Sequence, residues 1–217
     1  ANNPYFIDLD FLRDENFLKQ EDINMKSSNL GYVDYDELYD IRFKILRTAF
    51  NNFDLRDNDY QKFLKKEVQW ILDFSLFMAL KNFYKGKSWL DWDNDIRLRE
   101  ENALNHYKKL LKDEIEFQQF LQFVAYKQWF NLKRYANTNG VDIIGDMPIY
   151  VAYDSSDVWA NPDMFDLDKN RVPVHVAGVP PDDYAADGQL WGNPLYNWDY
   201  LEKDKFSWWG KRVQSSI

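Results

Sequence analysis

Apolar residues recur every three or four positions along much of the chain, which is the spacing of amphipathic helices that pack on one face. Residues 35–139 contain no proline, and their only glycine is Gly86. Asp34 precedes this region as an N-cap, and Gly86 and Gly140 follow apolar stripes as helix ends. The pattern therefore predicts four helices, over residues 35–53, 59–84, 94–111 and 113–137.

The pattern changes after Gly140 to a β-branched run that predicts a strand over residues 141–151. A strand directly after a long helix is typical of α/β folds, in which ligands gather at the carboxyl ends of parallel strands. Residues 154–200 hold five of the seven prolines and are predicted to form one long functional loop. A further helix is predicted over residues 208–213.

One buried strand needs neighbouring strands to pair its backbone N–H and C=O groups. The N-terminal residues 3–10 are predicted to form a turn followed by a short extended segment, and no second strand matches 141–151 in quality. The strand therefore either pairs with residues 5–9 or belongs to a larger protein of which this chain is a piece. We favour the larger protein.

The composition narrows the class of protein. The 217 residues include 27 Lys and Arg against 36 Asp and Glu, a net charge of −9, which argues against a nucleic-acid partner. The absence of cysteine excludes thiolate chemistry, and the presence of only two histidines argues against a metal site, so no metal or cofactor is expected. The first twenty residues carry several charges, which argues against a signal peptide. No apolar run is long enough to span a bilayer, which argues against a membrane partner. We expect a soluble, cytoplasmic protein.

Aromatic residues make up 18% of the chain. They fit a bulky core, and they are also the side chains on which flat, hydroxyl-rich sugar rings stack. Asp146, at the carboxyl end of the predicted strand, is placed either to face a substrate or to accept backbone hydrogen bonds in a turn. Residues 188–194 place an indole between two amides, which suits either a sugar-binding loop or a structural turn. The two histidines, His106 and His175, are expected to serve as surface or packing residues.

Four blocks together resemble the 4-α-glucanotransferase (amylomaltase) family of glycoside hydrolases. They occur in the order of the family, at residues 143–152, 154–159, 176–182 and 188–196. The N-terminal residues 3–8 and the Gln128-Trp129 pair resemble the same family. This resemblance implies a (β/α)₈ TIM barrel with a large, mainly helical insertion. The chain would be an incomplete, predominantly α-helical piece of that barrel.

The resemblance also implies three segments along the chain. Residues 1–33 would lie near the barrel at its N-terminal side, and residues 34–139 would form the helical insertion and a barrel helix. Residues 140–217 would supply a barrel strand and the region that covers the substrate.

The activity implied by the resemblance is the transfer of α-1,4-glucan segments between maltodextrins with retention of configuration. The ligand would be a maltooligosaccharide or an α-1,4-glucan. The resemblance places Asp146 at the end of the third barrel strand, in the substrate cleft. Gln189, Trp191 and Asn193 would belong to a mobile loop over the bound glucan, and Tyr184 would supply an aromatic side chain in that loop.

The chain departs from the family pattern where the catalytic residues would be. It has no Asp-His pair of the nucleophile strand and no Glu-Asp-Leu-Gly stretch of the acid/base. We therefore expect an internal fragment that supplies binding surface and is inactive alone. The alternative is a standalone glucan-binding or interaction module without catalysis. Exposed barrel edges should either cause self-association or leave part of residues 154–200 mobile.

Overall fold

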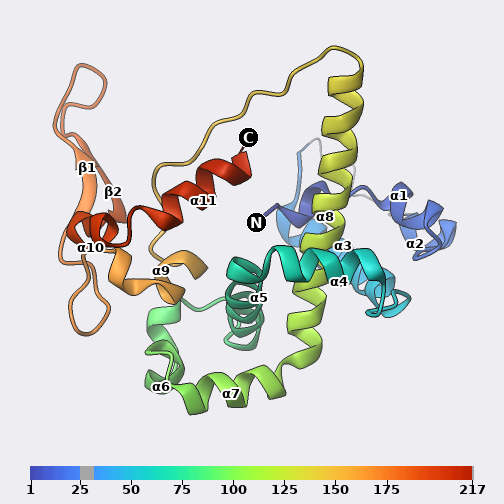
Figure 1. Cartoon of the computed structure of the whole chain (residues 1–217), viewed down its shortest axis with the longest axis horizontal. Helices are drawn as coiled ribbons and strands as arrows, with labels where there is room; N and C mark the ends of the chain where they lie inside the picture. Colours follow the sequence, from blue (N-terminus) through green and yellow to red (C-terminus); the bar gives the residue numbers. More distant parts are fainter. Residues whose placement is uncertain (25–31, 217) are drawn as a thin grey trace. The chain divides into compact units, whose positions relative to one another are not determined.

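The computed structural model describes residues 1–24 and 32–216 (Figure 1). Residues 25–31 of the expected N-terminal segment lie outside the described part, as does residue 217. The described chain is mostly helical, as expected. None of its helices is both long enough and apolar enough to cross a membrane.

The residues group into two compact units whose parts alternate along the sequence. The first unit comprises residues 1–75 and 111–143, and the second comprises residues 76–110 and 144–217. The expected division at residues 33 and 139 stays a prediction.

The first unit is a helical layer around an aromatic core. Its elements are a 3-10 helix (Pro4–Phe6), α1 (Leu9–Asp14), α2 (Gln20–Ile23), α3 (Tyr35–Asn51), α4 (Asn58–Lys66), the first half of α5 (Val68–Phe83) and α8 (Lys112–Thr138). Phe50 of α3 packs against Phe117 and Phe120 of α8, with ring centroids 5.5 and 5.6 Å apart. The helices predicted over 35–53 and 113–137 are therefore confirmed, and Asp34 caps the first by accepting from two backbone N–H groups.

Two predicted helices are each interrupted once. The helix expected over 59–84 is divided into α4 and α5 at Glu67, whose carboxylate accepts a 2.6 Å hydrogen bond from the Trp70 indole. The helix expected over 94–111 is divided into α6 (Asn94–Arg97) and α7 (Glu101–Leu110), with Arg99 at a φ of 62° between them. The breaks are short, one residue at Glu67 and three residues at 98–100, and the apolar stripe continues across them, so periodicity alone does not reveal them.

The N-terminal residues do not form the expected extended segment. Asp8 caps α1, and its backbone N–H and C=O are bound by the side-chain amide of Gln128, at 2.7 and 3.0 Å. Gln122 binds the backbone of Asn2 in the same way. These glutamines satisfy backbone groups of Asn2 and Asp8. The less favoured alternative, in which residues 5–9 pair with 141–151 as strands, is not realised, since neither segment is a strand in the described residues.

The strand predicted over residues 141–151 is not formed either. The segment has no regular structure, and the side chains of Ile144 and Ile149 are 94% and 60% exposed. In the described residues the only sheet is the β1–β2 pair, so no strand is present to pair with this segment.

The predicted loop over 154–200 holds much of the regular structure of the second unit. It contains α9 (Ser156–Ala160), a 3-10 helix (Pro162–Met164), β1 (Val176–Val179), β2 (Gln189–Pro194) and the start of α10 (Trp198–Lys203). The two strands pair antiparallel as a hairpin. The expected C-terminal helix is confirmed as α11 (Ser207–Ser216).

Candidate functional site

Residues 154–159, which precede the β1–β2 hairpin, are held in place by contacts within the second unit. Asp154 accepts hydrogen bonds from the Lys81 ammonium at 2.7 Å and from the Trp89 backbone at 3.3 Å. Trp159 is 1% exposed and packs against Trp92, with ring centroids 5.8 Å apart. This block is therefore structural, and it holds the chain that leads into the hairpin.

The hairpin depends on two glycines at which its backbones approach closely. A Cβ on Gly178 would lie 2.7 Å from the carbonyl oxygen of Gln189, and one on Gly188 would lie 2.5 Å from that of Val179. Gly188 also adopts a φ of +69°, which L side chains rarely adopt. Of the residues expected in a mobile loop over the ligand, Gln189, Trp191 and Asn193 lie on the hydrogen-bonded strand β2, and Tyr184 lies in the connection between β1 and β2.

Three of the five predicted binding residues lie together on this strand. Gln189, Trp191 and Asn193 all lie on β2, and the surface that these three residues form is called the β2 face; the register of β2 against β1 is irregular between Leu190 and Pro194, where Gly192 has a φ of 77°. The Trp191 indole N–H donates to the Gln189 side-chain oxygen at 3.0 Å, and the Asn193 amide donates to the Val151 carbonyl at 2.8 Å. Tyr150 meets Trp191 edge to face at 5.8 Å. Trp191 is 47% exposed, so its oriented ring is available to a ligand.

The other two predicted residues are not brought to this face. Tyr184 is 98% exposed in the connection between β1 and β2, where its backbone N–H donates to Asp182. Asp146 is exposed in the segment that lacks regular structure, and it makes no hydrogen bond or ion pair with the described residues. Its expected place at the end of a strand is not realised, because that strand is not formed.

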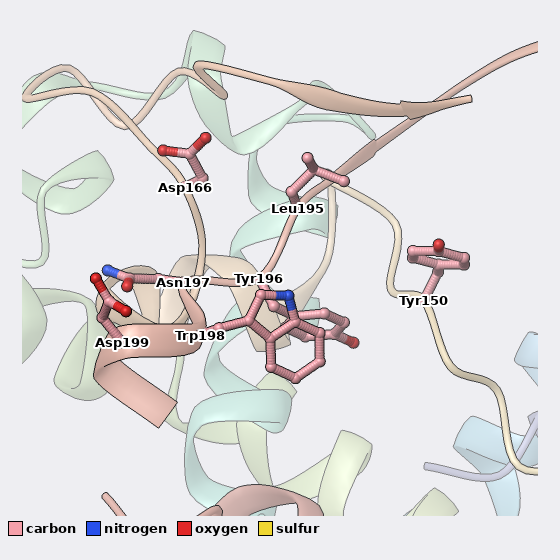
Figure 2. A pocket seen from close by; sticks show the side chains of 7 residues that line it. All are labelled: Tyr150, Asp166, Leu195, Tyr196, Asn197, Trp198 and Asp199. Carbon is pink, nitrogen blue, oxygen red and sulfur yellow. The ribbon is translucent and has the colours of Figure 1, made fainter. Parts of the chain in front are cut away.

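A hollow of about 460 Å³ lies beside this face in the same unit (Figure 2). It is lined by Tyr150, Asp166, Leu195, Tyr196, Asn197, Trp198 and Asp199. Figure 2 shows the rings of Trp198 and Tyr196 together, with Tyr150 on one side and the polar groups of Asn197 and Asp199 on the other. Tyr150 thus contacts Trp191 and also lines the hollow.

The floor of the hollow is held by Tyr196, which is 8% exposed. Its hydroxyl donates to the Ile149 carbonyl at 3.0 Å, and its ring packs on Phe165 at 5.3 Å. Burial raises the pKa of Tyr196 to about 12. The side chain is therefore neutral near pH 7 and serves as a donor that ties Ile149 to the segment that follows β2.

The sequence did not single out the residues of the hollow as a site. Tyr150 lies within the block 143–152, and Trp198 follows the block 188–196 by two residues. The position of a tryptophan so close to that block was the one sequence signal that could have indicated this hollow. His175, expected at the surface, is exposed, and its Nδ1 lies 2.7 Å from the Asp166 carboxylate at the rim. His106 is exposed as well. The described residues hold no group of three or more acidic or histidine side chains that could bind a metal ion.

The side chains of this site have chemistry that suits a sugar. An oriented indole beside amide groups can stack on a flat ring and hydrogen bond to its hydroxyls. The family model for 4-alpha-glucanotransferase matches residues 1–217. The chain therefore belongs to the 4-alpha-glucanotransferase family.

The curated relatives carry the same description. The chain is 46% identical over 221 residues to the 4-alpha-glucanotransferase of Clostridium butyricum and 42% identical over 217 residues to that of Aquifex aeolicus. Both matches cover 100% of this chain, but only 45% and 44% of the relatives. The chain thus spans less than half the length of these proteins.

Solved structures agree with the family assignment. The amylomaltase of Streptococcus agalactiae, solved in complex with acarbose, matches with a TM-score of 0.93 and 44% identity. That match covers 99% of this chain and 44% of the amylomaltase. The amylomaltase of Corynebacterium glutamicum shares the fold, with a TM-score of 0.69 at 19% identity.

Proposed function

We propose that this chain supplies glucan-binding surface to a 4-α-glucanotransferase that transfers α-1,4-glucan segments between maltodextrins. The observation that carries the proposal is the face formed by Gln189, Trp191 and Asn193, with the Trp191 ring oriented and exposed. The acarbose complex of the Streptococcus agalactiae enzyme supports a maltooligosaccharide as the ligand. In the whole protein, this chain is an incomplete part of a TIM barrel that acts in the cytoplasm.

The residues of this face have different roles. The Trp191 indole stacks on a glucosyl ring, because its flat apolar surface matches the C–H face of the sugar. Gln189 accepts the indole N–H and so fixes the orientation of the ring, while its amide N–H group donates to a sugar hydroxyl. Asn193 ties β2 to the backbone of Val151 and positions the strand under the ligand. Asp146 and Tyr184 are proposed to contact the same glucan from outside this face, since both side chains are exposed.

The chemistry belongs to residues that this chain does not supply. Retention requires a carboxylate nucleophile about 5–5.5 Å from an acid/base carboxyl group. The sequence lacks the family's motifs for both groups, so the chain binds a glucan without cleaving it.

Calorimetric titration with maltoheptaose tests the binding. We expect Trp191→Ala to raise the Kd about tenfold or more, since burying one aromatic face contributes roughly 1.5–3 kcal/mol. The matched control is Trp129→Ala, which removes an exposed tryptophan from α8. An equal effect of both substitutions, or saturable binding that neither changes, would refute the assignment of this face.

Incubation with maltotriose tests the absence of catalysis. We expect chromatography to recover maltotriose unchanged. The appearance of glucose together with longer maltodextrins would show that the chain holds a working catalytic pair.

Measurements of the oligomeric state and of protease sensitivity test whether the chain exposes surfaces that the rest of a barrel would cover. We expect light scattering to report a dimer, or limited proteolysis to cut within residues 154–200. A monodisperse monomer with a protease-resistant 154–200 region would contradict this expectation.

A further inference from the structure

We infer that the hollow between Tyr150 and Trp198 is a second sugar subsite, which binds one glucosyl residue of the same α-glucan. The inference rests on the proposed function, because it takes the same class of ligand. Its volume of about 460 Å³ falls within the range of roughly 300–1,000 Å³ that is usual for small-ligand pockets. None of the residues that line it was among the five expected to bind substrate.

The walls are preorganised by contacts within the second unit. The backbone N–H of Asp166 donates to the Leu195 carbonyl at 2.9 Å, and that of Asn197 donates to the Met164 carbonyl at 2.9 Å. Trp198 packs on the buried Tyr196, with ring centroids 5.5 Å apart. A ligand therefore meets a wall whose backbone and whose Trp198 and Tyr196 rings are already packed, which lowers the cost of ordering on binding.

The polar groups in the hollow match hydroxyls better than they match ions. Acceptors come from the carboxylate of Asp199 and from that of Asp166, whose Oδ2 also lies 2.7 Å from His175 Nδ1. Donors come from the Trp198 indole and the Asn197 amide, whose N–H groups have no hydrogen-bond partner among the described residues. A sugar hydroxyl both donates and accepts, so it uses both kinds of group, whereas a cation uses only the acceptors. The carboxylates repel an anion.

Tyr150 connects the hollow to the face already described. Its ring contacts Trp191 at 5.8 Å and also lines the hollow. A glucan that stacks on Trp191 therefore has a second aromatic platform, Trp198, beyond Tyr150. Trp198 is 59% exposed and has room to stack on a ring.

Fluorine NMR of the chain labelled with 5-fluorotryptophan distinguishes binding at Trp191 from binding at Trp198. The Trp191→Phe and Trp198→Phe variants assign the resonances of these two residues. Their chemical shifts are then followed as maltotriose is added. We expect both resonances to shift in the unmodified chain. In Trp191→Ala, the Trp198 resonance should still shift, at a higher maltotriose concentration.

The possible outcomes distinguish this inference from the proposed function. A shift at Trp191 without one at Trp198 overturns the second subsite and leaves the β2 face standing. A shift at Trp198 without one at Trp191 supports the hollow and refutes that face. Loss of the Trp198 shift in Trp191→Ala overturns the subsite, because Trp198 would then only sense Trp191 through Tyr150. If neither resonance shifts, both proposals fail.

A carboxylate variant tests the ligand chemistry. We expect Asp199→Ala to raise the Kd reported by Trp198 about tenfold, the factor that follows from losing one hydrogen bond to a charged group. The matched control is Glu202→Ala, which removes an exposed carboxylate from the same helix outside the hollow. Equal effects would overturn the role of Asp199. Tetramethylammonium ion that shifts Trp198 at lower concentration than maltotriose would show a cation site and overturn the assignment to sugar.

Discussion

The hairpin that presents Trp191 should depend on the absence of a side chain at Gly188. In Gly188→Ala, the new Cβ would lie 2.5 Å from the Val179 carbonyl oxygen, 3.0 Å from the Pro180 carbonyl carbon and 3.1 Å from the Pro181 nitrogen. All three are backbone atoms, so no rotation of a side chain can relieve the contacts. The φ of +69° adds about 1–2 kcal/mol for a residue with a Cβ.

Gly192 provides a control that separates the two contributions. Its φ is +77°, but a Cβ there would have no atom within 4 Å. Gly192→Ala therefore carries only the backbone cost, about 1–2 kcal/mol, a factor of roughly 5–30 in the opening equilibrium. Gly188→Ala carries that cost and a backbone clash besides. Because a two-stranded hairpin is marginally stable, the second change should open it.

Hydrogen exchange followed by mass spectrometry measures the opening of the β1–β2 hairpin directly. We expect Gly188→Ala to remove the protection of peptides that cover β1 and β2, while Gly192→Ala lowers it about 5- to 30-fold. Peptides from α8 should keep their protection in both variants. If β1 and β2 are protected equally in the two variants, the close approach at Gly188 is wrong.

Three further predictions concern the second unit, each measured by urea unfolding. Lys81→Met should destabilise the unit by roughly 1.5–3 kcal/mol, because the ammonium donates to the carbonyls of Gly86 and Lys87 and to Asp154; a change within error would show these bonds to be dispensable. Trp159→Ala should cost about 3–5 kcal/mol, since the ring is 1% exposed, and a loss below about 1 kcal/mol would contradict its place in the core. Burial raises the pKa of Tyr196 from 10.0 to about 12, so its neutral form contributes stability that is complete below pH 10 and is lost as the pH rises towards 12. Tyr196→Phe should lose about 1 kcal/mol at pH 7 and show a shallower fall between pH 10 and 12; an unchanged fall would rule out Tyr196 as its source.

Local signals in the sequence were sufficient for part of the fold. The start of α3 at Asp34 and the end of α8 before Gly140 follow from capping, which depends on residues within one turn. The break at Glu67 was not predictable in the same way, because the apolar stripe runs through it. The hairpin was missed because its strands are short and proline-flanked, and because their pairing depends on close approaches at Gly178 and Gly188.

In the candidate site, too, local patterns predicted some residues, whereas others depend on contacts between distant parts of the sequence. Gln189, Trp191 and Asn193 fall within one sequence block that forms one strand, β2, so the block was enough to group them. The part played by Tyr150 depends on a contact from Tyr196 to Ile149, 47 residues apart in the chain, which no local pattern encodes. Asp146 was expected at the end of a strand, and that expectation required partner strands that the described residues do not supply.

A crystal structure of the chain grown with maltoheptaose tests the central claim most directly. The account predicts a glucosyl ring stacked on the Trp191 indole, with the Gln189 amide within hydrogen-bond distance of a sugar hydroxyl. A glucan bound only elsewhere, such as on the exposed aromatic residues of α8, would contradict it.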